Sequence, residues 1–370
     1  MPRLYFLPLR CSTGPMRTIR VDVAIAGGGI AGLWIANLLL LRGFDVALCD
    51  PGHGAGAQTL ASQGLIHGGV KYALHGRPDD TFDALRDMPP RWRRCLAGEG
   101  EIDLRGVATA SDACHLWSRD ALAARLAGFL GSRLVHGRVV RLSRADYPAP
   151  FAGQSGTLYR LDDFAVDVPS LCRTLSAPLG ERLLTLEVPS EGVIVRNGRV
   201  AAFRIGDLAV EAERFVFAAG AGNAALADAA GFETPMRRRP LKQVLVHSPH
   251  PEPLFVHCVA GLAAEPDLTV STHPGYHYLG GALATAGVRR TEAEQISAAK
   301  RALRASLPWI DWDARRFETL SIDRAEPARP GGRRPEQAFV AAHENVVLVW
   351  PVKLALAPDL GDRALRALSA

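Results

Sequence analysis

The sequence predicts an α/β fold, in which a Rossmann-like dinucleotide-binding domain carries an inserted α+β domain with an antiparallel sheet. A short apolar run over 21–26 reads as a buried parallel strand, and it leads directly into the glycine pattern G-x-G-x-x-G. A second apolar run over 45–49 ends in Asp50, which completes the order strand, turn, helix, strand, acid. Strand-rich stretches over 85–160 and 237–321 interrupt this pattern and indicate the second domain.

The glycine pattern indicates a site for a dinucleotide. Gly27 permits the tight turn, Gly29 lets the backbone approach a pyrophosphate, and Gly32 lets the helix over 33–41 pack closely on the strand. The start of that helix offers unpaired N–H groups and a positive dipole end to the phosphates. Asp50 is expected to accept hydrogen bonds from the adenosine ribose. The expected cofactor contacts here are Gly27, Gly29, Ile30, Ala31, Gly32 and Asp50.

Composition and charge limit the classes of partner. The chain of 370 residues is 48% hydrophobic and 22% charged, which is typical of a soluble globular protein. Its formal net charge is +5, and basic residues are interspersed except in the run Arg237-Arg238-Arg239, so nucleic-acid binding is not expected. We expect no transmembrane segment, and a peripheral membrane contact stays open.

Cysteine spacing bears on the compartment. The six cysteines form no C-x-x-C pair, which predicts free thiols in a reducing compartment and a cytoplasmic location. Residues 1–16 hold two arginines and three prolines in and around a short apolar stretch, and we expect them to form a disordered extension rather than a signal peptide.

Local capping and turn signals predict further elements. Asp167 followed by Pro169 is typical of a helix start, and Asn197-Gly198 is typical of a two-residue hairpin turn. Thr291 and Glu294 fit the capping box of another helix. Additional elements are expected as a helix over 119–130, strands over 214–219 and 346–349, and a helix over 358–368.

The alternation of these elements predicts two discontinuous domains. The cofactor-binding domain is expected to comprise 17–84, 161–236 and 322–370, and the substrate domain 85–160 and 237–321. Ligand sites form preferentially at such domain interfaces, so the site is expected between the two.

Four segments together resemble the FAD-dependent superfamily of D-amino acid oxidase, glycine oxidase and glycerol-3-phosphate dehydrogenase. They are the N-terminal fingerprint, the loop 62–72, the pair 166–171 and 217–222, and Arg329-Pro330 with the later 350–354. The resemblance implies FAD as the cofactor and hydride transfer to flavin N5 from a small amino acid, hydroxy acid or polyol phosphate. It also implies oxygen or an electron carrier as the acceptor.

The loop 62–72 is similar to the flavin-contacting loop of the glycerol-phosphate and hydroxyglutarate branches. Glycines allow a planar isoalloxazine to approach the backbone closely. His67 is expected to contact flavin or substrate and to act as a base for an alcohol substrate, whereas a structural histidine is the alternative. Flavin contacts implied by the resemblance are Ser62, Gln63, Gly64, Gly68, Ala219, Gly220, Lys353 and Leu354.

Lys353 follows an expected buried strand and precedes an expected helix. A cation and a helix N-terminus at that place would stabilise negative charge on the N1–C2=O edge of the reduced flavin. The turn departs from the oxidase pattern, which usually has glycine there, and Lys353-Leu354 is more similar to the glycerol-phosphate dehydrogenase pattern. An exposed surface lysine is the alternative.

Arginines are the expected anion ligands. Arg329 resembles the residue with which glycine oxidase-like members bind the substrate carboxylate, and a bidentate guanidinium suits that group, although Arg324 competes for the role. The candidate catalytic residues are thus His67, Lys353 and Arg329. In the histidine-rich region 241–283, His277 and Tyr278 are expected to face the substrate, and the histidine spacing predicts no metal site.

Two other classes of function stay open. The pattern G-x-G-x-x-A over 220–225 could form a second nucleotide unit of an NAD(P)H-dependent monooxygenase or reductase, with Arg237-Arg238-Arg239 meeting a 2′-phosphate. No clear strand with an acid follows it, however. The third class is a non-catalytic flavin-binding protein, against which the intact flavin loop and Lys353 argue.

Overall fold

The N-terminal strand β1 (Arg17–Ala26) lies at the centre of an eight-stranded sheet. It pairs in parallel with β2 (Val46–Cys49) and β12 (Leu208–Phe217), and β12 pairs in parallel with β19 (Val346–Trp350). The computed structural model describes residues 16–52, 57–69, 84–119, 138–259, 266–329 and 337–369. At the edges of this sheet lie β9 (Leu183–Leu184), β10 (Val193–Arg196), β11 (Arg199–Ile205) and β18 (Phe339–His343). The predicted parallel α/β sheet is therefore confirmed.

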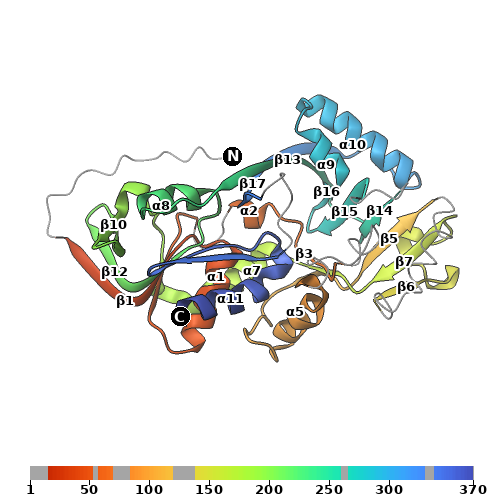
Figure 1. The fold of residues 1–370 in the computed structure, drawn as a ribbon. Coiled ribbons are helices and arrows are strands. Elements are labelled where there is room, and N and C mark those ends of the chain that lie inside the picture. The colour runs from red at the N-terminus through yellow and green to blue at the C-terminus, as the bar shows by residue number, and fades with distance from the viewer. Residues whose placement is uncertain are drawn as a thin grey trace.

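Successive residues of β1 face two separate cores. Val23 and Ile25 pack into one apolar cluster and Ala24 and Ala26 into another, as the alternation of a strand requires. Over the first face lie α1 (Ile30–Leu41), α5 (Met88–Ala97), α7 (Val168–Ser176) and α11 (Ala357–Ser369). Over the second lies α8 (Asn223–Ala229). Both faces of the sheet are thereby buried, which suits the apolar strands (Figure 1).

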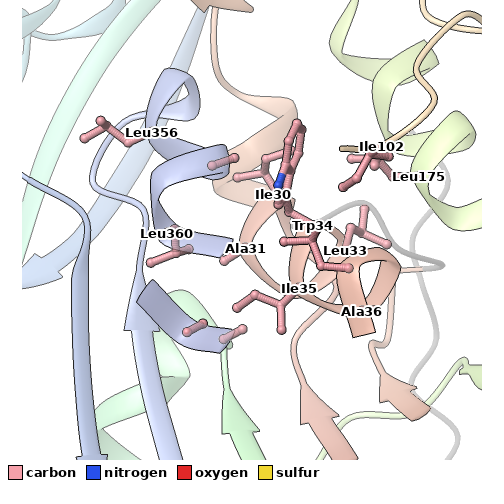
Figure 2. Close-up of a cluster of buried hydrophobic side chains, with 14 of the residues drawn as sticks. Ile30, Ala31, Leu33, Trp34, Ile35, Ala36, Ile102, Leu175, Leu356 and Leu360 are labelled. Atoms are coloured by element: carbon pink, nitrogen blue, oxygen red, sulfur yellow. The ribbon is translucent and has the colours of Figure 1, made fainter. Parts of the chain in front are cut away.

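The C-terminal helix α11 packs against α1 in the middle of the first core. Figure 2 shows Leu360 of α11, and Leu356 just before this helix, in one apolar cluster with side chains of α1 that include Trp34. A Cβ atom at Gly361 would lie only 2.5 Å from the side chain of Leu38, so glycine permits this close approach. The nearly uniform burial of α1 follows, because helices and strands surround it.

A second eight-stranded sheet, almost wholly antiparallel, extends away from the first (Figure 1). Its strands in order are β17 (Arg316–Pro327), β13 (Met236–His247), β16 (Tyr276–Gly280), β15 (Leu268–His273), β14 (Phe255–Cys258), β5 (Cys114–Ser118), β7 (Thr157–Leu161) and β6 (Val139–Arg141). Two helices, α9 (Ala282–Gly287) and α10 (Glu292–Ser306), cover it. β13 and β17 pair along their whole length, from Met236↔Pro327 to His247↔Arg316, and they connect the two lobes.

Short elements complete the fold near the junction of the lobes. A three-stranded sheet contains β3 (Leu65–Ile66), β8 (Phe164–Val166) and β4 (Thr109–Ser111). Helix α2 (Ala57–Leu60) and the 3₁₀ helices η5 (Gly220–Gly222) and η7 (Leu354–Leu356) lie beside the first sheet. Further 3₁₀ turns are η1 (Arg144–Asp146), η2 (Ala149–Phe151), η3 (Ala177–Arg182) and η4 (Ser190–Gly192). In the part of the chain that the structure describes, no helix combines the length and the apolar character needed to cross a bilayer.

The predicted caps and turns are confirmed. The Asp167 carboxylate accepts a hydrogen bond from the Ser170 N–H at 2.8 Å, and Thr291 and Glu294 form a complete capping box. Asn197 and Gly198 both have positive φ, 53° and 75°, as the two-residue turn between β10 and β11 requires. The helix expected over 119–130 lies outside the described residues, apart from its first position.

Two predicted domain limits do not coincide with the packing. The segment assigned to the substrate domain from residue 85 includes α5, whose Trp92 is buried in the core beneath α1 and donates its indole N–H to the Ala355 carbonyl. The limit between 321 and 322 cuts β17, although that strand pairs continuously with β13. Strand continuity and shared burial, rather than changes of composition, set these limits. The first strand also starts at Arg17 instead of residue 21, because its pairing with β12 begins there.

Candidate functional site

A cavity of about 1200 Å³ lies where the carboxyl ends of the parallel strands meet the face of the second sheet. The ends of β1, β2 and β19 reach it, and so do residues of β13 and β17. In open α/β sheets, ligands bind at the carboxyl ends of the strands, so this is the expected place for a cofactor. Segments far apart in sequence contribute to it, from the glycine turn at Gly27 to the turn at Lys353.

The glycine turn borders this cavity, and each glycine meets a different steric limit. A Cβ atom at Gly27, where φ is 104°, would lie 2.5 Å from the Ala218 carbonyl oxygen. At Gly32 it would lie 1.9 Å from the Gly27 oxygen, inside the packing of helix on strand. At Gly29, which lines the cavity, the nearest atom would be Thr59 Oγ1 at 3.1 Å. The turn therefore forms a cradle that side chains would fill, and this fits a pyrophosphate.

Asp50 holds the glycine turn in place. Its side chain, in a residue only 5% exposed, accepts hydrogen bonds from the N–H groups of Gly28 at 2.7 Å and Gly52 at 2.8 Å. Asp50 also lines the cavity, so contact with a ribose stays a prediction. Sequence reasoning missed Thr59, whose hydroxyl accepts the N–H of Ile30 at the start of α1.

The loop predicted to contact flavin lines the cavity in part. Ser62, Gln63 and His67 reach it, whereas Gly64 and Gly68 do not. Gly64 has φ 68°, and a Cβ there would lie 2.1 Å from the Val166 oxygen of β8. The N–H of Gly68 donates to the Asp163 carboxylate at 2.9 Å. These two glycines therefore pack the loop against β8 and Asp163. The prediction was that they would let the flavin ring approach the backbone. Val70 to Tyr72 lie outside the described residues.

Lys353 is a buried residue of the cavity wall, 8% exposed, which excludes the surface-lysine alternative. It follows β19, and η7 and α11 begin directly after it. The turn that places it is unusual, because Val352 has φ 64° and the N–H of Lys353 donates to the Pro351 carbonyl at 2.6 Å. A β-branched residue pays in strain for this conformation. Leu354 lines the cavity as well.

The structure separates the two candidate anion ligands. Arg324, on β17, lines the cavity, whereas Arg329 is exposed beyond the end of that strand and is not part of the described wall. Arg324 pairs across the strands with Arg239. Beside them Glu326, 3% exposed, accepts hydrogen bonds from Arg237 at 2.6 and 2.8 Å. Arg237 of the arginine run is therefore hydrogen-bonded to the buried carboxylate of Glu326.

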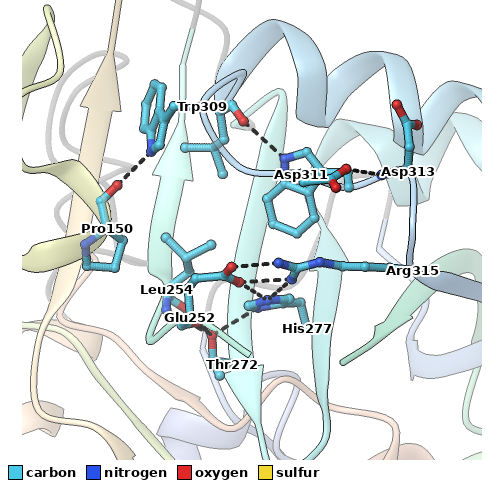
Figure 3. A network of polar contacts seen from close by, with 11 residues as sticks. Pro150, Glu252, Leu254, Thr272, His277, Trp309, Asp311, Asp313 and Arg315 are labelled. Atoms are coloured by element: carbon cyan, nitrogen blue, oxygen red, sulfur yellow. Dashed lines mark hydrogen bonds and ion pairs between the residues drawn. The ribbon is translucent and has the colours of Figure 1, made fainter. Parts of the chain in front are cut away.

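His277 lies outside the cavity, contrary to prediction. Its ring, 0% exposed, contacts Glu252 and Thr272 at 3.1 Å each, and Arg315 pairs with Glu252 at 2.6 Å (Figure 3). Burial, helped by nearby Arg315, lowers the pKa of His277 to about 4. Burial would raise the pKa of Glu252, but hydrogen bonds from Arg315 lower it to about 2. The network joins β15 and β16 to the segments that precede β14 and β17.

Tyr278 lies next to the cavity wall without forming part of it. Its buried hydroxyl lies 2.7 Å from the Ala61 carbonyl oxygen and 2.7 Å from Gln243 Oε1, and Gln243 does line the cavity. Sequence reasoning missed Gln243, and it also missed His257 and Thr269, which line the same wall. The alternation of side chains along β13 could have indicated Gln243, but pairing with strands distant in sequence decides which face of β13 lines the cavity.

The second nucleotide unit suggested by 220–225 does not form. Ala219 and Gly220 line the same cavity as the first glycine turn, and after α8 the chain enters β13 of the antiparallel sheet. A dinucleotide unit needs a following parallel strand, which β13 is not. Among the described residues, no group of three or more histidine, cysteine or acidic side chains is arranged to hold a metal.

A family model described as FAD dependent oxidoreductase (DAO) matches residues 22–349. The chain belongs to this family of FAD-dependent oxidoreductases. A probable FAD-dependent oxidoreductase of Pseudomonas aeruginosa is 43% identical over 362 residues, 95% of this chain and 92% of that protein. Its crystal structure has a TM-score of 0.80 at 38% identity, over 95% of this chain and 91% of that one. The cofactor is accordingly FAD, and the glycine cradle fits its pyrophosphate.

More distant relatives share the fold or one segment. Glycine oxidase from Geobacillus kaustophilus has a TM-score of 0.69 at 18% identity, over 95% of each chain. Glycerol-3-phosphate dehydrogenase of Pseudomonas tolaasii is 46% identical over 54 residues, which is 15% of this chain and 10% of that protein. The first comparison concerns the fold alone, and the second a short stretch.

Proposed function

We propose that this chain oxidises a small amine or hydroxy compound that bears a carboxylate or phosphate, with FAD as the hydride acceptor. The observation that carries the proposal is the single cavity in which the glycine turn, Lys353 and Arg324 come together. Bound FAD supplies the acceptor atom N5 and the electron sink. Glycine and glycerol 3-phosphate, the compounds in the names of two relatives, are both small and each bears an anionic group.

Arg324 is the proposed ligand of the anionic group. It lies in the cavity wall opposite Arg239 on the β13–β17 pair, and its guanidinium is the feature that suits an anion. A planar guanidinium binds carboxylate or phosphate with two hydrogen bonds. Arg329 stays an alternative ligand.

Lys353 is proposed to act on the cofactor side of the cavity. Its buried ammonium and the first N–H groups of η7 and α11 would stabilise negative charge on the pyrimidine edge of the reduced flavin. A neutral amine substrate needs no strong base, whereas a hydroxy substrate needs one, and His67 in the cavity wall would serve. Oxygen or an electron carrier would reoxidise the flavin. The five described cysteines are buried and form no disulfide with one another, which supports a cytoplasmic location.

Anaerobic reduction of the flavin tests the proposal directly. The FAD-loaded protein is mixed without oxygen with glycine, the alanine enantiomers, L-proline, glycolate, the lactate enantiomers and glycerol 3-phosphate, and flavin absorbance near 450 nm is followed. We expect at least one of these compounds to bleach the flavin. If none does at millimolar concentration, while dithionite bleaches it fully, the proposed function is wrong.

Three arginine variants then locate the anion ligand. Loss of a charge-assisted, partly desolvated contact typically costs about 2–5 kcal/mol, so we expect Arg324→Met to weaken substrate binding about 30-fold or more. FAD affinity should be little changed. Arg329→Ala tests the alternative ligand, and Arg20→Met, at an exposed position on β1, is the control. A large effect of Arg329→Ala with none of Arg324→Met would reverse the assignment.

A further inference from the structure

Lys353 reaches the cavity wall through a turn that the preceding residue disfavours. Val352 has φ 64°, and the N–H of Lys353 donates to the Pro351 carbonyl oxygen at 2.6 Å, which defines a three-residue turn. A β-branched residue adopts positive φ only at a cost in free energy. Such a conformation persists where the surrounding structure fixes the chain around it, so the contacts on either side of the turn have to account for it.

Before the turn, two side chains continue the bonding of β19 to the β12 side of the sheet. The parallel register of the two strands ends at Leu348. Asn223 then donates from its side-chain amide nitrogen to the Val349 carbonyl oxygen at 2.9 Å, and the Trp350 indole N–H donates to the Gly220 carbonyl oxygen at 2.9 Å. The last two residues of β19 are thereby bonded to the segment that follows β12.

Both donors are wholly inside the protein and belong to the surroundings of the cavity. Asn223 is 0% exposed and Trp350 is 1% exposed. The amide oxygen of Asn223 accepts the N–H of Ala219 at 2.7 Å, so a main-chain donor and a main-chain acceptor together fix the direction of this amide. Ala219, Gly220 and Trp350 line the same cavity as Lys353. The two contacts therefore join separate parts of one wall.

After the turn, the chain is held by a different helix. The indole N–H of Trp92, on α5, donates to the Ala355 carbonyl oxygen at 2.9 Å, and the N–H of Leu356 donates to the Lys353 carbonyl oxygen at 3.1 Å. The chain is thus fixed on both sides of a short connection. Val352 closes that connection with its left-handed conformation, and Lys353 follows directly.

We propose that Asn223 and Trp350 are positioning residues for Lys353, which hold the strained Val352 turn and thereby keep the lysine in the cavity wall. This inference rests on the proposed function, in which Lys353 stabilises the reduced flavin. Without these two hydrogen bonds, Val352 would relax towards an extended conformation, because that removes its strain. Lys353, the next residue, would then leave its place.

Chemical labelling of Lys353 tests its position apart from the flavin. The FAD-loaded protein is treated briefly with acetic anhydride, and acetylation of each lysine is measured by peptide mass spectrometry. Trp350→Phe keeps an aromatic ring beside Phe339 and removes the indole N–H. Loss of one hydrogen bond shifts an equilibrium about two- to tenfold, so Lys353 should be acetylated faster by about that factor. Lys300, on α10, is the internal reference.

Removal of the strain should make the two hydrogen bonds less important. Glycine adopts positive φ about as readily as negative φ, so the turn no longer opposes its neighbours in Val352→Gly. Trp350→Phe should therefore accelerate labelling of Lys353 less in the Val352→Gly background than in the parent protein. Asn223→Ala removes the other hydrogen bond, and we expect the same dependence on Val352.

The flavin midpoint potential connects the turn to the proposed role of Lys353. Trp350→Phe should lower the potential in the same direction as Lys353→Met but by less, because the lysine is displaced for only part of the time. Trp312→Phe is the matched control, since its buried indole donates to the Leu307 carbonyl oxygen at 3.0 Å in the core of the second sheet. Both tryptophan variants should have a lower Tm, but only Trp350→Phe should change the labelling and the potential.

The outcomes separate the inference from the proposed function. Unchanged labelling of Lys353 in Trp350→Phe, with FAD bound, would overturn the inference, and so would an equal acceleration in Trp312→Phe or in the Val352→Gly background. Faster labelling together with a potential that neither Trp350→Phe nor Lys353→Met alters would support the positioning role. That result would at the same time refute the electrostatic role of Lys353 in the proposed function.

Discussion

Val352 is held in a strained turn, and replacing it with glycine tests that strain. Its φ of 64° and the short hydrogen bond from Lys353 to Pro351 define a three-residue turn that glycine adopts freely. A non-glycine residue there costs about 1–3 kcal/mol, which Val352→Gly relieves. Against this, glycine raises the entropy of the unfolded chain by about 0.5–1 kcal/mol, and a half-buried valine side chain contributes about 1 kcal/mol. The gain from the relieved strain and the losses from chain entropy and side-chain burial therefore nearly cancel.

The free energy of unfolding of Val352→Gly should therefore stay within about 1 kcal/mol of the parent protein. Val340 is the matched control, because it is also half-buried but lies in the regular strand β18. Val340→Gly relieves no strain and should lose about 2 kcal/mol, a drop of a few degrees in Tm. Thermal unfolding of both FAD-loaded proteins compares them. Equal destabilisation of the two variants would refute the strain argument.

Three further predictions follow from the site and the buried histidines. Gly29→Val should abolish FAD binding with an unchanged circular dichroism spectrum, because the side chain enters the cradle beside Thr59; bound flavin at full occupancy would contradict this. Lys353→Met should lower the flavin midpoint potential by tens of millivolts, where about 30 mV is roughly 1.4 kcal/mol, and an unchanged potential would rule out the electrostatic role. Burial lowers the pKa of His273 and of His277 to about 4, from 6.5, so the unfolded chain takes up protons first. Resistance to urea should therefore fall between pH 6.5 and pH 4, and a flat profile would contradict the assignment.

The fold and the glycine turn could be predicted because their causes are local. The steric limit at Gly32 comes from Gly27 within one strand–turn–helix unit, and the caps at Asp167 and Thr291 depend on residues three positions away. Such contacts are readable from spacing alone. The position of Lys353 followed in the same way from an apolar strand and a following helix.

The side chains of the second sheet were less predictable, because a strand has a period of two. His277 and Tyr278 are adjacent in β16, so they point to opposite faces, and both could not face one cavity. Which face is inside depends on pairing with β13 and β15, which are distant in sequence. Arg324 and Arg329 differ likewise, since β17 ends between them at Pro327. Gln243 was missed for the same reason, because the pairing of β13 with β16 and β17 decides which of its faces lines the cavity.

The central position of β1 has a consequence for biosynthesis. Its neighbour β12 is remote in the chain, since the paired residues Arg20 and Glu211 are 191 positions apart, and the helix that packs on α1 is the last one, α11. At about 5–20 residues per second, β1 waits roughly 10–40 s on the ribosome for its partner. The first strand and its apolar helix are exposed to chaperones and to other chains throughout that time. We therefore expect flavin binding to follow synthesis of the segment with Lys353, which completes the cavity wall, rather than synthesis of the glycine turn.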